Sequence, residues 1–370
     1  MTAAAERPAL ADHAHMAMAL RLARRGLHTT TPNPRVGCVL VRAGEVVGRG
    51  WHERAGAPHA EANALREAGA RAHGATAYVT LEPCSHHGRT PPCADALIEA
   101  GVARVVAAMQ DPNPLVAGQG LARLAAAGVD VACGLLASEA EELNVGFIRR
   151  MRSGRPWVRA KMAVSLDGRS ALADGRSQWL TGAPARRDGH RWRARACAIL
   201  TGMGTVRADD PELTVREVPT TRQPLRVVLD TRLELSETAR LVSSARPDRP
   251  VLVVTAVEDE SRHGRLRRPG LDMLCLPAAQ GHIAPATLLS ALAGRGVNEL
   301  HVEAGARLTG ALLSAGLVDE LLLYQALCLV GDGRGVADLP ALLALGDAPR
   351  LRLVEQRWVG ADLRLRLRPT

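Results

Sequence analysis

Apolar positions in the first half of the chain alternate between the spacing of helices and the spacing of strands. Residues that recur every three or four positions predict helices near 11–25, 60–72, 93–100, 121–127 and 139–150. Short apolar runs predict strands at 36–41, 45–50, 75–81 and 103–108. Helices and strands in this order are typical of one layered α/β domain.

The second half of the chain repeats the alternation. Its apolar runs predict strands at 157–164, 196–201, 225–229, 251–255, 271–276, 299–302 and 321–324. Helical patterns lie between them at 184–195, 285–293 and 308–315. We therefore expect a second α/β domain with several parallel strands and crossover helices.

A short polar stretch, Arg152-Ser-Gly-Arg-Pro156, separates the two halves. Glycine and proline interrupt regular structure, so this stretch is a candidate domain boundary. The length of 370 residues is sufficient for two domains with separate cores. We expect one domain at 1–150, a linker at 151–156 and a second domain at 157–370.

Composition narrows the possible functions. No apolar run approaches the roughly 20 residues that cross a bilayer, and residues 1–10 lack the features of a signal peptide, so we expect a cytoplasmic protein without a membrane partner. Seven cysteines, an odd number, favour metal binding or burial over disulfides. The net charge of +9 leaves open a nucleic acid, an anionic substrate or merely solvated basic faces. Five Trp, two Tyr and one Phe offer little surface for stacking bases, which disfavours a nucleic acid.

The clearest candidate site lies in the first half. His59 and Glu61 open a predicted helix, and Cys84 follows Pro83 at the end of a predicted strand. Cys93 opens the next helix. One imidazole and two thiolates can occupy three corners of a tetrahedral zinc site, which leaves the fourth for a water whose pKa falls toward about 7. Glu61, which is not a ligand, can then carry a proton from the water to the leaving ammonia.

Each part of this pattern also has an ordinary explanation. The two cysteines can be small core residues, and His59 with Glu61 can form the cap of a helix. The four residues in this order, with one intervening helix, instead favour a catalytic site.

These residues resemble the zinc signature of the cytidine deaminase superfamily. The spacer between the cysteines, Ser85 to Pro92, is longer than usual and is similar to that of the riboflavin-pathway deaminases, not to the nucleoside or nucleic-acid editing branches. Residues 31–39 are similar to the substrate loop of that branch. The resemblance implies that Asn33 helps to hold the pyrimidine, although a turn role before proline stays open. It also implies that the spacer lines the pocket. His86 and His87 in the spacer are alternative ligands, but their loop position favours contacts with the ligands or with the substrate.

In the second half, Gly202-Met-Gly204 follows a predicted strand, but a glycine pair alone indicates either a phosphate contact or a tight turn. Segments that begin at Lys161, Ser177 and Thr205 resemble successive motifs of the riboflavin-pathway reductases, which have a dihydrofolate-reductase-like fold. Residues 302–313 resemble their late nucleotide-binding segment. The chain as a whole therefore resembles the bifunctional deaminase-reductases of riboflavin biosynthesis, with a cytidine-deaminase-like α/β/α domain first.

The resemblance implies one Zn²⁺ per chain in the first domain and NADPH in the second. The implied cofactor contacts are Ala163, Trp179, Thr205, Asp209, Thr231, Gly305, Ala306, Arg307, Leu308, Thr309, Gly310 and Ala311. The implied substrate contacts are Asn33, Ser177, Arg193, Leu213, Arg216 and Glu303. Guanidinium groups suit a phosphate, and a carboxylate suits ribose hydroxyls. Each of these residues also has an alternative as a core residue, surface ion-pair partner or turn cap.

The chain departs from the reductase pattern at three places. Cys197 replaces a small polar or acidic residue, Ala304 replaces a glycine, and Gln325 begins a replacement of the usual Ala-Pro. The added Cβ of Ala304 either weakens NADPH binding or is accommodated.

The predicted function is hydrolytic deamination of 2,5-diamino-6-(5-phosphoribosylamino)pyrimidin-4(3H)-one, followed by NADPH-dependent reduction of its ribosyl chain to give 5-amino-6-(5-phosphoribitylamino)uracil. We expect this phosphorylated pyrimidine ribotide, but no specific nucleic acid, as a partner, and a homo-oligomer. One alternative is a nucleic-acid editing deaminase with an unrelated C-terminal domain, which predicts salt-dependent binding to nucleic acid. Another is a structural zinc protein or nucleotide-sensing scaffold, which predicts a closed fourth position on the metal.

Overall fold

The computed structural model describes residues 10–85, 92–114 and 116–370. The chain divides into two compact units, Met1–Gly154 and Arg155–Thr370. None of the described helices is long and apolar enough to cross a membrane.

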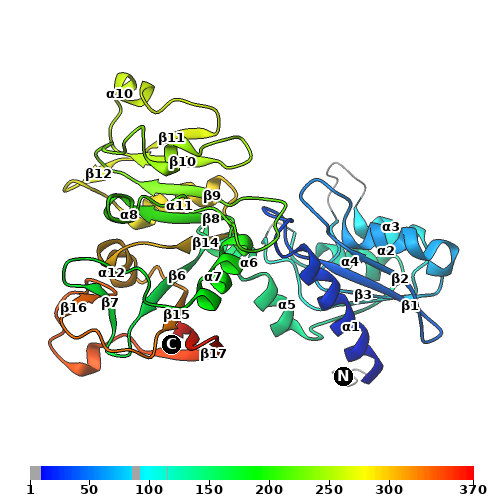
Figure 1. Ribbon diagram of the computed structural model, residues 1–370. Helices are drawn as coiled ribbons and strands as arrows, with labels where there is room; N and C mark the ends of the chain where they lie inside the picture. The colour runs from blue at the N-terminus through cyan, green and yellow to red at the C-terminus, as the bar shows by residue number, and fades with distance from the viewer. Residues whose placement is uncertain (1–9, 86–91, 115) are drawn as a thin grey trace. The chain divides into compact units, whose positions relative to one another are not determined.

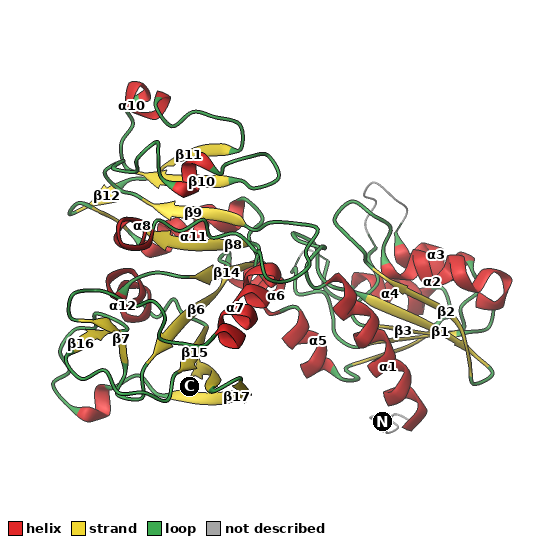
Figure 2. Ribbon diagram, in the orientation of Figure 1, coloured by secondary structure: helices red, strands yellow, loops and turns green. Residues whose placement is uncertain are grey.

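The first unit is built on a five-stranded sheet with the order β2-β1-β3-β4-β5. Strand β1 pairs antiparallel with both β2 and β3, whereas β3, β4 and β5 are parallel (Figures 1 and 2). The strands are β1 (Gly37–Arg42), β2 (Glu45–Trp51), β3 (Thr76–Val79), β4 (Arg104–Ala107) and β5 (Asp130–Cys133). The helices are α1 (Leu10–Ala23), α2 (Ala60–Ala68), α3 (Cys93–Glu99), α4 (Gln119–Ala126), α5 (Ala137–Leu143) and α6 (Val145–Ser153).

Helices cover both faces of this sheet. Successive residues of a strand point to opposite faces, so Cys38 and Leu40 of β1 pack with buried residues of α2, α3 and α4. Val39 and Val41 face the other way and pack with α1, α5 and α6. The first unit is therefore the expected α/β/α sandwich.

The second unit is built on a nine-stranded sheet with the order β11-β10-β9-β8-β14-β6-β15-β18-β17. The seven strands from β11 to β15 in this order are parallel, and β18 and β17 extend the sheet antiparallel. Its strands are β6 (Trp157–Val164), β8 (Ala198–Gly202), β9 (Leu225–Leu229), β10 (Val251–Thr255), β11 (Leu271–Cys275), β14 (Glu299–Val302), β15 (Glu320–Gln325), β17 (Leu351–Val359) and β18 (Asp362–Pro369).

Shorter elements and helices surround that sheet. The helices are α7 (Ala183–Arg195), α8 (Met203–Asp209), α9 (Arg240–Ser243), α10 (Glu260–Gly264), α11 (Pro285–Gly294) and α12 (Ala306–Ser314). Two small two-stranded sheets are formed by β7 (Arg169–Leu172) with β16 (Gly333–Gly335) and by β12 (Ala278–Ala279) with β13 (His282–Ile283).

One predicted helix was wrong. Instead of a single helix at 139–150, α5 and α6 are separated at Asn144. The Asn144 amide accepts a hydrogen bond from Arg35 N at 2.8 Å and donates one to Arg35 O at 3.0 Å. Asparagine side chains compete with the helical backbone in this way, and here the partner is 109 residues away in the sequence.

Candidate active sites

The first candidate site lies where α2, α3 and the end of β3 converge. His59 is the N-cap residue of α2, Cys93 is the first residue of α3, and Cys84 lies in the loop after β3. His59 Nδ1 lies 3.3 Å from Cys93 Sγ and 3.6 Å from Cys84 Sγ. The three donor atoms all lie within 4.8 Å of one another. The structure thus brings the three predicted ligands together.

This donor set suits zinc. Bonds of about 2.0 Å to nitrogen and 2.3 Å to sulfur at a tetrahedral angle separate the two donor atoms by roughly 3.5 Å. The observed distances of His59 Nδ1 from the two sulfur atoms are 3.3 and 3.6 Å. The imidazole and thiols therefore already have the spacing that a tetrahedral zinc ion requires.

Ionisation of the two thiols is uneven. A hydrogen bond with Cys93 lowers the pKa of the Cys84 thiol, and His59 lowers it further. The same bond, together with burial, raises the pKa of Cys93. Cys84 is therefore the thiol that more readily becomes the thiolate that a metal binds.

Glu61 lies in the first turn of α2, and its side chain is buried. Burial raises the pKa of the Glu61 carboxyl to about 7, against the lowering effect of the positive charge on His59. A carboxyl with such a pKa can both accept and donate a proton near neutral pH.

Asn33 is held by a histidine that sequence analysis did not single out. His52 Nδ1 lies 3.1 Å from the carbonyl oxygen of Pro58, and its Nε2 lies 3.2 Å from Asn33 Nδ2. A carbonyl oxygen only accepts, so Nδ1 carries the ring hydrogen and Nε2 accepts from the Asn33 amide. This arrangement fixes which way the amide points. Burial lowers the pKa of His52, which favours the neutral ring that the arrangement needs.

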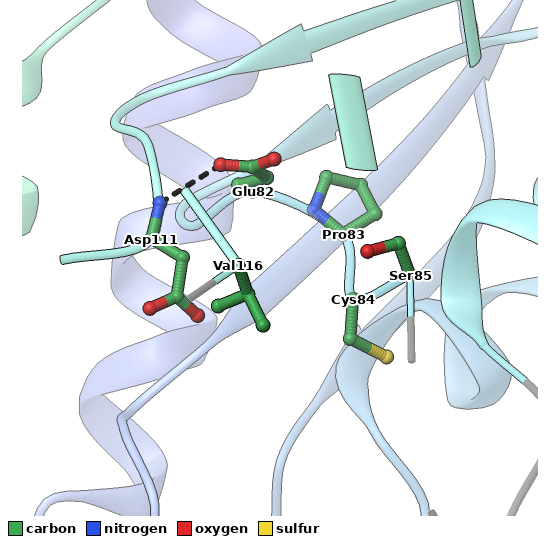
Figure 3. Close-up of a pocket in the computed structure, with 6 residues that line it drawn as sticks. All are labelled: Glu82, Pro83, Cys84, Ser85, Asp111 and Val116. Atoms are coloured by element: carbon green, nitrogen blue, oxygen red, sulfur yellow. Dashed lines mark hydrogen bonds between the residues drawn. The ribbon is translucent and has the colours of Figure 1, made fainter. Parts of the chain in front are cut away.

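A small cleft lies beside Cys84. Its lining residues are Glu82, Pro83, Cys84, Ser85, Asp111 and Val116 (Figure 3). Most of the spacer that we expected to line the pocket, including His86 and His87, lies outside the described residues.

The second candidate site lies at the carboxyl edge of the parallel strands in the second unit. Ala163 is near the end of β6, Thr205 and Asp209 are in α8 directly after β8, and Thr231 follows β9. Gly305 follows β14, which lies between β6 and β8 in the sheet. Ligands of open α/β sheets bind at this edge, so the sheet brings together residues from four segments of the sequence.

The backbone at this edge suits a dinucleotide. Helix α12 begins at Ala306, and its N-cap Gly305 provides no side-chain cap, so backbone N–H groups point outward at a partly positive helix end. A Cβ added to Gly305 would lie 3.9 Å from Thr205 Oγ1, which shows how closely the turns after β14 and β8 approach. Uncapped helix starts with glycine are typical sites for a pyrophosphate.

The remaining predicted cofactor residues differ in exposure. Trp179 is 69% exposed, and the Arg186 guanidinium lies 4.5 Å above its ring. The side chain of Thr309 is buried. Gly310 packs so tightly that an added Cβ would lie 2.0 Å from Asp338 O. Thr309 and Gly310 therefore lie on the packed face of α12, whereas Gly305, Arg307 and Ala311 are exposed.

Two predicted substrate residues bind each other. Arg193 Nε lies 2.5 Å from Glu303 Oε1, and Arg193 Nη2 lies 2.7 Å from Glu303 Oε2. Burial raises the pKa of Glu303, but the charge of Arg193 outweighs this effect and holds the pKa well below its ordinary value. Arg193 Nη1 also donates to Thr214 O at 3.0 Å. These bonds hold the charged Arg193–Glu303 pair in place at the carboxyl edge of the sheet.

The other predicted substrate residues of this unit differ in exposure. Ser177 is half-buried in the loop before α7, and Arg216 is exposed with its Nη1 3.1 Å from Thr214 Oγ1. The Leu213 side chain is buried in the hydrophobic core around β9 and β10. Any contact of Leu213 with substrate therefore falls to its backbone.

The three departures from the reductase pattern have local explanations. Cys197 is buried, and its sulfur accepts from Asn298 N and Glu299 N, both at 3.3 Å. Ala304 packs against the main core, and Gln325 ends β15 opposite Val164. Cys197 thus bonds the amino end of β14, at the opposite end of the strand from the candidate cofactor site.

Sequence analysis missed three residues near the sites. They are His52, Glu82 and Lys161. Glu82 directly precedes Pro83 and Cys84, and this position is the only local signal in the sequence that indicates a role for it. Lys161 is the first residue of a segment that resembles a reductase motif. Burial lowers the pKa of its amino group, and its Nζ lies 6.0 Å from the centre of the Tyr324 ring.

Comparison with known proteins covers both units. The cytidine and deoxycytidylate deaminase zinc-binding region matches residues 10–109, and the RibD C-terminal domain matches residues 156–365. The chain is 52% identical over 369 residues to the riboflavin biosynthesis protein RibD of Escherichia coli (strain K12), covering 96% of this chain and 99% of that protein.

Two solved structures are similar over nearly the whole chain. RibD from Acinetobacter baumannii has a TM-score of 0.89 at 43% identity, covering 97% of this chain and 99% of that one. A diaminohydroxyphosphoribosylaminopyrimidine deaminase/5-amino-6-(5-phosphoribosylamino)uracil reductase from Thermotoga maritima has a TM-score of 0.87 at 32% identity, with the same coverage of 97% and 99%.

Proposed function

The chain belongs to the RibD family of bifunctional deaminase-reductases of riboflavin biosynthesis, and from this premise we propose how its residues carry out the two reactions. Its first domain is a zinc-binding deaminase and its second an NADPH-dependent reductase. The alternative of an unrelated C-terminal domain was therefore wrong. We propose that the diaminopyrimidinone ribotide is deaminated first and that the resulting uracil derivative is then reduced in its ribosyl chain.

In the deaminase, His59, Cys84 and Cys93 would hold the metal. Zinc, when bound, supplies a Lewis acid that lowers the pKa of water. Glu61 would pass one proton of that water to the ring nitrogen and then carry its second proton to the amino group, which leaves as ammonia, because the buried Glu61 carboxyl has a pKa near neutrality. The single observation that carries this proposal is the convergence of the three donor atoms within 4.8 Å of one another.

Asn33 would orient the pyrimidine. Because His52 accepts from Asn33 Nδ2, the Asn33 oxygen is the atom turned toward other partners, and an oxygen accepts hydrogen bonds from ring N–H or amino groups. An aminopyrimidinone offers such donors on its Watson–Crick edge.

In the reductase, the carboxyl edge of the sheet would bind NADPH, which supplies hydride when bound. The proposed contacts are Ala163, Trp179, Thr205, Asp209, Thr231 and residues 305–311. The uncapped start of α12 would receive phosphate oxygens through its backbone N–H groups. For the substrate, Glu303 would accept hydrogen bonds from the ribose hydroxyls. Arg193 would hold Glu303 in place and contact the phosphate. The remaining contacts would come from Ser177, Arg216 and the backbone of Leu213.

The experiment that tests both activities uses the zinc-loaded chain and the diaminopyrimidinone ribotide, with and without NADPH. Ammonia release without NADPH, followed by substrate-dependent loss of NADPH absorbance when it is added, is the expected result. Ammonia release without NADPH loss would refute the reductase part, and the absence of both signals would refute the whole proposal.

We further propose that the chain forms a homo-oligomer in the cytoplasm. Strand β17 is an edge of the nine-stranded sheet, and Leu353 and Trp358 on it are 52% and 60% exposed. An exposed apolar edge strand favours pairing with another chain. None of the seven cysteines, all of which lie in the described ranges, forms a disulfide, as is usual in a reducing compartment. Analytical ultracentrifugation should show a dimer or larger assembly that Leu353→Lys weakens, and a wild-type monomer would contradict it.

A further inference from the structure

A buried carboxylate that takes no part in the proposed chemistry lies shortly before one of the proposed zinc ligands. Glu82 follows β3, and its side chain is buried. Its Oε1 accepts hydrogen bonds from Gly120 N at 2.8 Å and Leu121 N at 3.3 Å. Its Oε2 accepts from Asp111 N at 3.0 Å and Gly118 N at 2.9 Å. Both carboxylate oxygens are thus committed to backbone donors.

Three of these four donors belong to the start of α4. Gly120 and Leu121 lie in its first turn, and its N-cap Gly118 has no side chain with which to cap the helix. Glu82 therefore supplies the missing cap from a distant part of the sequence. A carboxylate is the favoured acceptor at this helix end because of its partial positive charge. Across the described part of the chain, no side-chain cation pairs with Glu82.

The same contact reaches Cys84 through the backbone. Gly120 packs against Pro83 so closely that an added Cβ would lie 1.9 Å from Pro83 O. On the other side, Ala94 N donates to Cys84 O at 3.1 Å, and Cys93 N donates to Cys84 Sγ at 3.3 Å. Cys84 is therefore held between the first turn of α3 and the turn that Glu82 bonds to α4.

Figure 3 shows the Glu82 carboxylate turned toward the backbone of Asp111, while the Cys84 thiol points away from it. Asp111 and Val116 line the cleft beside Cys84. Glu82 is thus neither a metal ligand nor a group directed at the reacting atoms. Any effect that it has on the reaction passes through the backbone it bonds.

We propose that Glu82 is a positioning residue of the deaminase, whose carboxylate anchors the Pro83–Cys84 turn to α4 and so fixes the Cys84 sulfur relative to His59 and Cys93. The inference rests on the proposed zinc site of the deaminase. Removal of the carboxylate leaves four N–H groups without an acceptor and frees the turn to move. Because partners that orient metal ligands tune metal affinity, the zinc site should weaken.

The test uses the full-length chain with Glu82→Ala and Glu82→Gln. Zinc affinity is measured by competition with a chromophoric chelator, and the ligand geometry by the thiolate-to-metal absorption of the Co²⁺-substituted protein. Glu82→Ala should lower zinc affinity about 10-fold to 100-fold and shift the cobalt spectrum. Glu82→Gln should have an intermediate effect, since its amide keeps one acceptor oxygen and turns an NH₂ group toward two N–H donors.

Two controls make the result specific. Glu139→Ala removes an exposed glutamate from the first turn of α5 in the same domain and should leave both readouts unchanged. The thermal unfolding transition of the first domain, followed by circular dichroism, reports whether that domain folds in each variant, and reductase activity with the deaminated substrate reports the same for the second domain. A further variant, Gly120→Ala, keeps the Glu82 side chain but adds a Cβ that would lie 1.9 Å from Pro83 O and 3.2 Å from Glu82 Oε1, so it disturbs the same contact and should weaken zinc binding in the same direction.

Wild-type zinc affinity and an unchanged cobalt spectrum in Glu82→Ala would overturn the proposal. Loss of the unfolding transition of the first domain in both Glu82→Ala and Glu82→Gln would also overturn it, because Glu82 would then be a general folding residue of that domain. The zinc and cobalt readouts decide the role of Glu82 even if the wild-type chain released no ammonia, an outcome that would refute the proposed function alone.

Discussion

Replacement of His52 by leucine tests how the deaminase orients its substrate. Leucine keeps an apolar group in this buried position but offers neither of the two ring nitrogens. The variant therefore loses the hydrogen bond to Pro58 O and the one from Asn33 Nδ2. The Asn33 amide then has no partner that determines which of its two ends faces the pyrimidine.

The expected magnitude follows from these two hydrogen bonds. Each contributes about 1 kcal/mol net in a folded protein, so the loss is about 2 kcal/mol. A factor of ten in rate corresponds to about 1.4 kcal/mol of transition-state stabilisation. If the whole loss weakens binding of the transition state, kcat/KM for ammonia release should fall roughly 30-fold. Reduction of the deaminated substrate should keep its wild-type rate, because His52 lies in the first unit.

The assay is a double-mutant cycle on deaminase kcat/KM with His52→Leu, Asn33→Ala and the double variant. If His52 acts through Asn33, the double variant should be no slower than Asn33→Ala alone. Losses that simply add, or a His52→Leu enzyme within about threefold of wild type, would refute the reasoning about the amide.

Three further predictions concern the metal and the buried charges. Removal of zinc with a chelator should abolish ammonia release but leave NADPH oxidation with the deaminated substrate, and a loss of both would contradict the assignment of zinc to the first domain. Glu320→Ala should destabilise the reductase domain by about 3–5 kcal/mol, because it removes one partner each from the fully buried Arg159 and the largely buried Arg366; this corresponds to a loss of roughly 6–20 °C in Tm by calorimetry. Arg193 holds the pKa of Glu303 well below its ordinary value of 4.5, although burial raises it. The ion pair therefore stabilises the folded domain above pH 4.5, and this stabilisation is lost as the pH falls from 4.5 through the lower pKa of the folded state. The stability difference between wild type and Glu303→Gln should therefore shrink below about pH 4, and a constant difference in denaturant titrations would refute the pairing.

The convergence of the three proposed zinc ligands could be predicted because each of them carries a local signal. His59 and Cys93 stand where helices begin, and Cys84 stands after a strand, so the α/β order itself brings them to one edge of the sheet. The α/β order of both domains and the parallel strands of the second were predictable for the same reason, since apolar runs and helical spacing are properties of short windows.

The residues that support the site could not be predicted in this way. Asn33 and His52 are 19 residues apart, and Glu82 bonds donors 29 to 39 residues further along the chain. Backbone donors carry no sequence signature, so only its position directly before Pro83 and Cys84 distinguishes Glu82 from a surface glutamate. The pairing of Arg193 with Glu303 spans 110 residues, and sequence analysis accordingly gave each a separate role toward the substrate.

The C-terminal strands show a different failure. Residues 363–367 alternate leucine and arginine, a pattern typical of a strand with one exposed face, yet sequence analysis did not predict β18. In the structure the arginines Arg364 and Arg366 are buried, because they pair with Glu355 and Glu320, whereas the leucines that alternate with them are half-buried. Charged residues rarely lie on a buried face unless they are paired, and the pairing depends on strands that adjoin only in the folded sheet.

The most direct test of the central claim, that one chain deaminates in its first domain and reduces in its second, is to supply the Glu61→Gln variant separately with the diaminopyrimidinone ribotide and with its deaminated product, and to identify the products by mass spectrometry. The account predicts that the variant reduces the deaminated product at the wild-type rate and leaves the diamino compound unchanged, since loss of a general acid-base typically costs about 10²-fold to 10⁴-fold in rate. Wild-type conversion of the diamino compound to the ribityl product by this variant would contradict it.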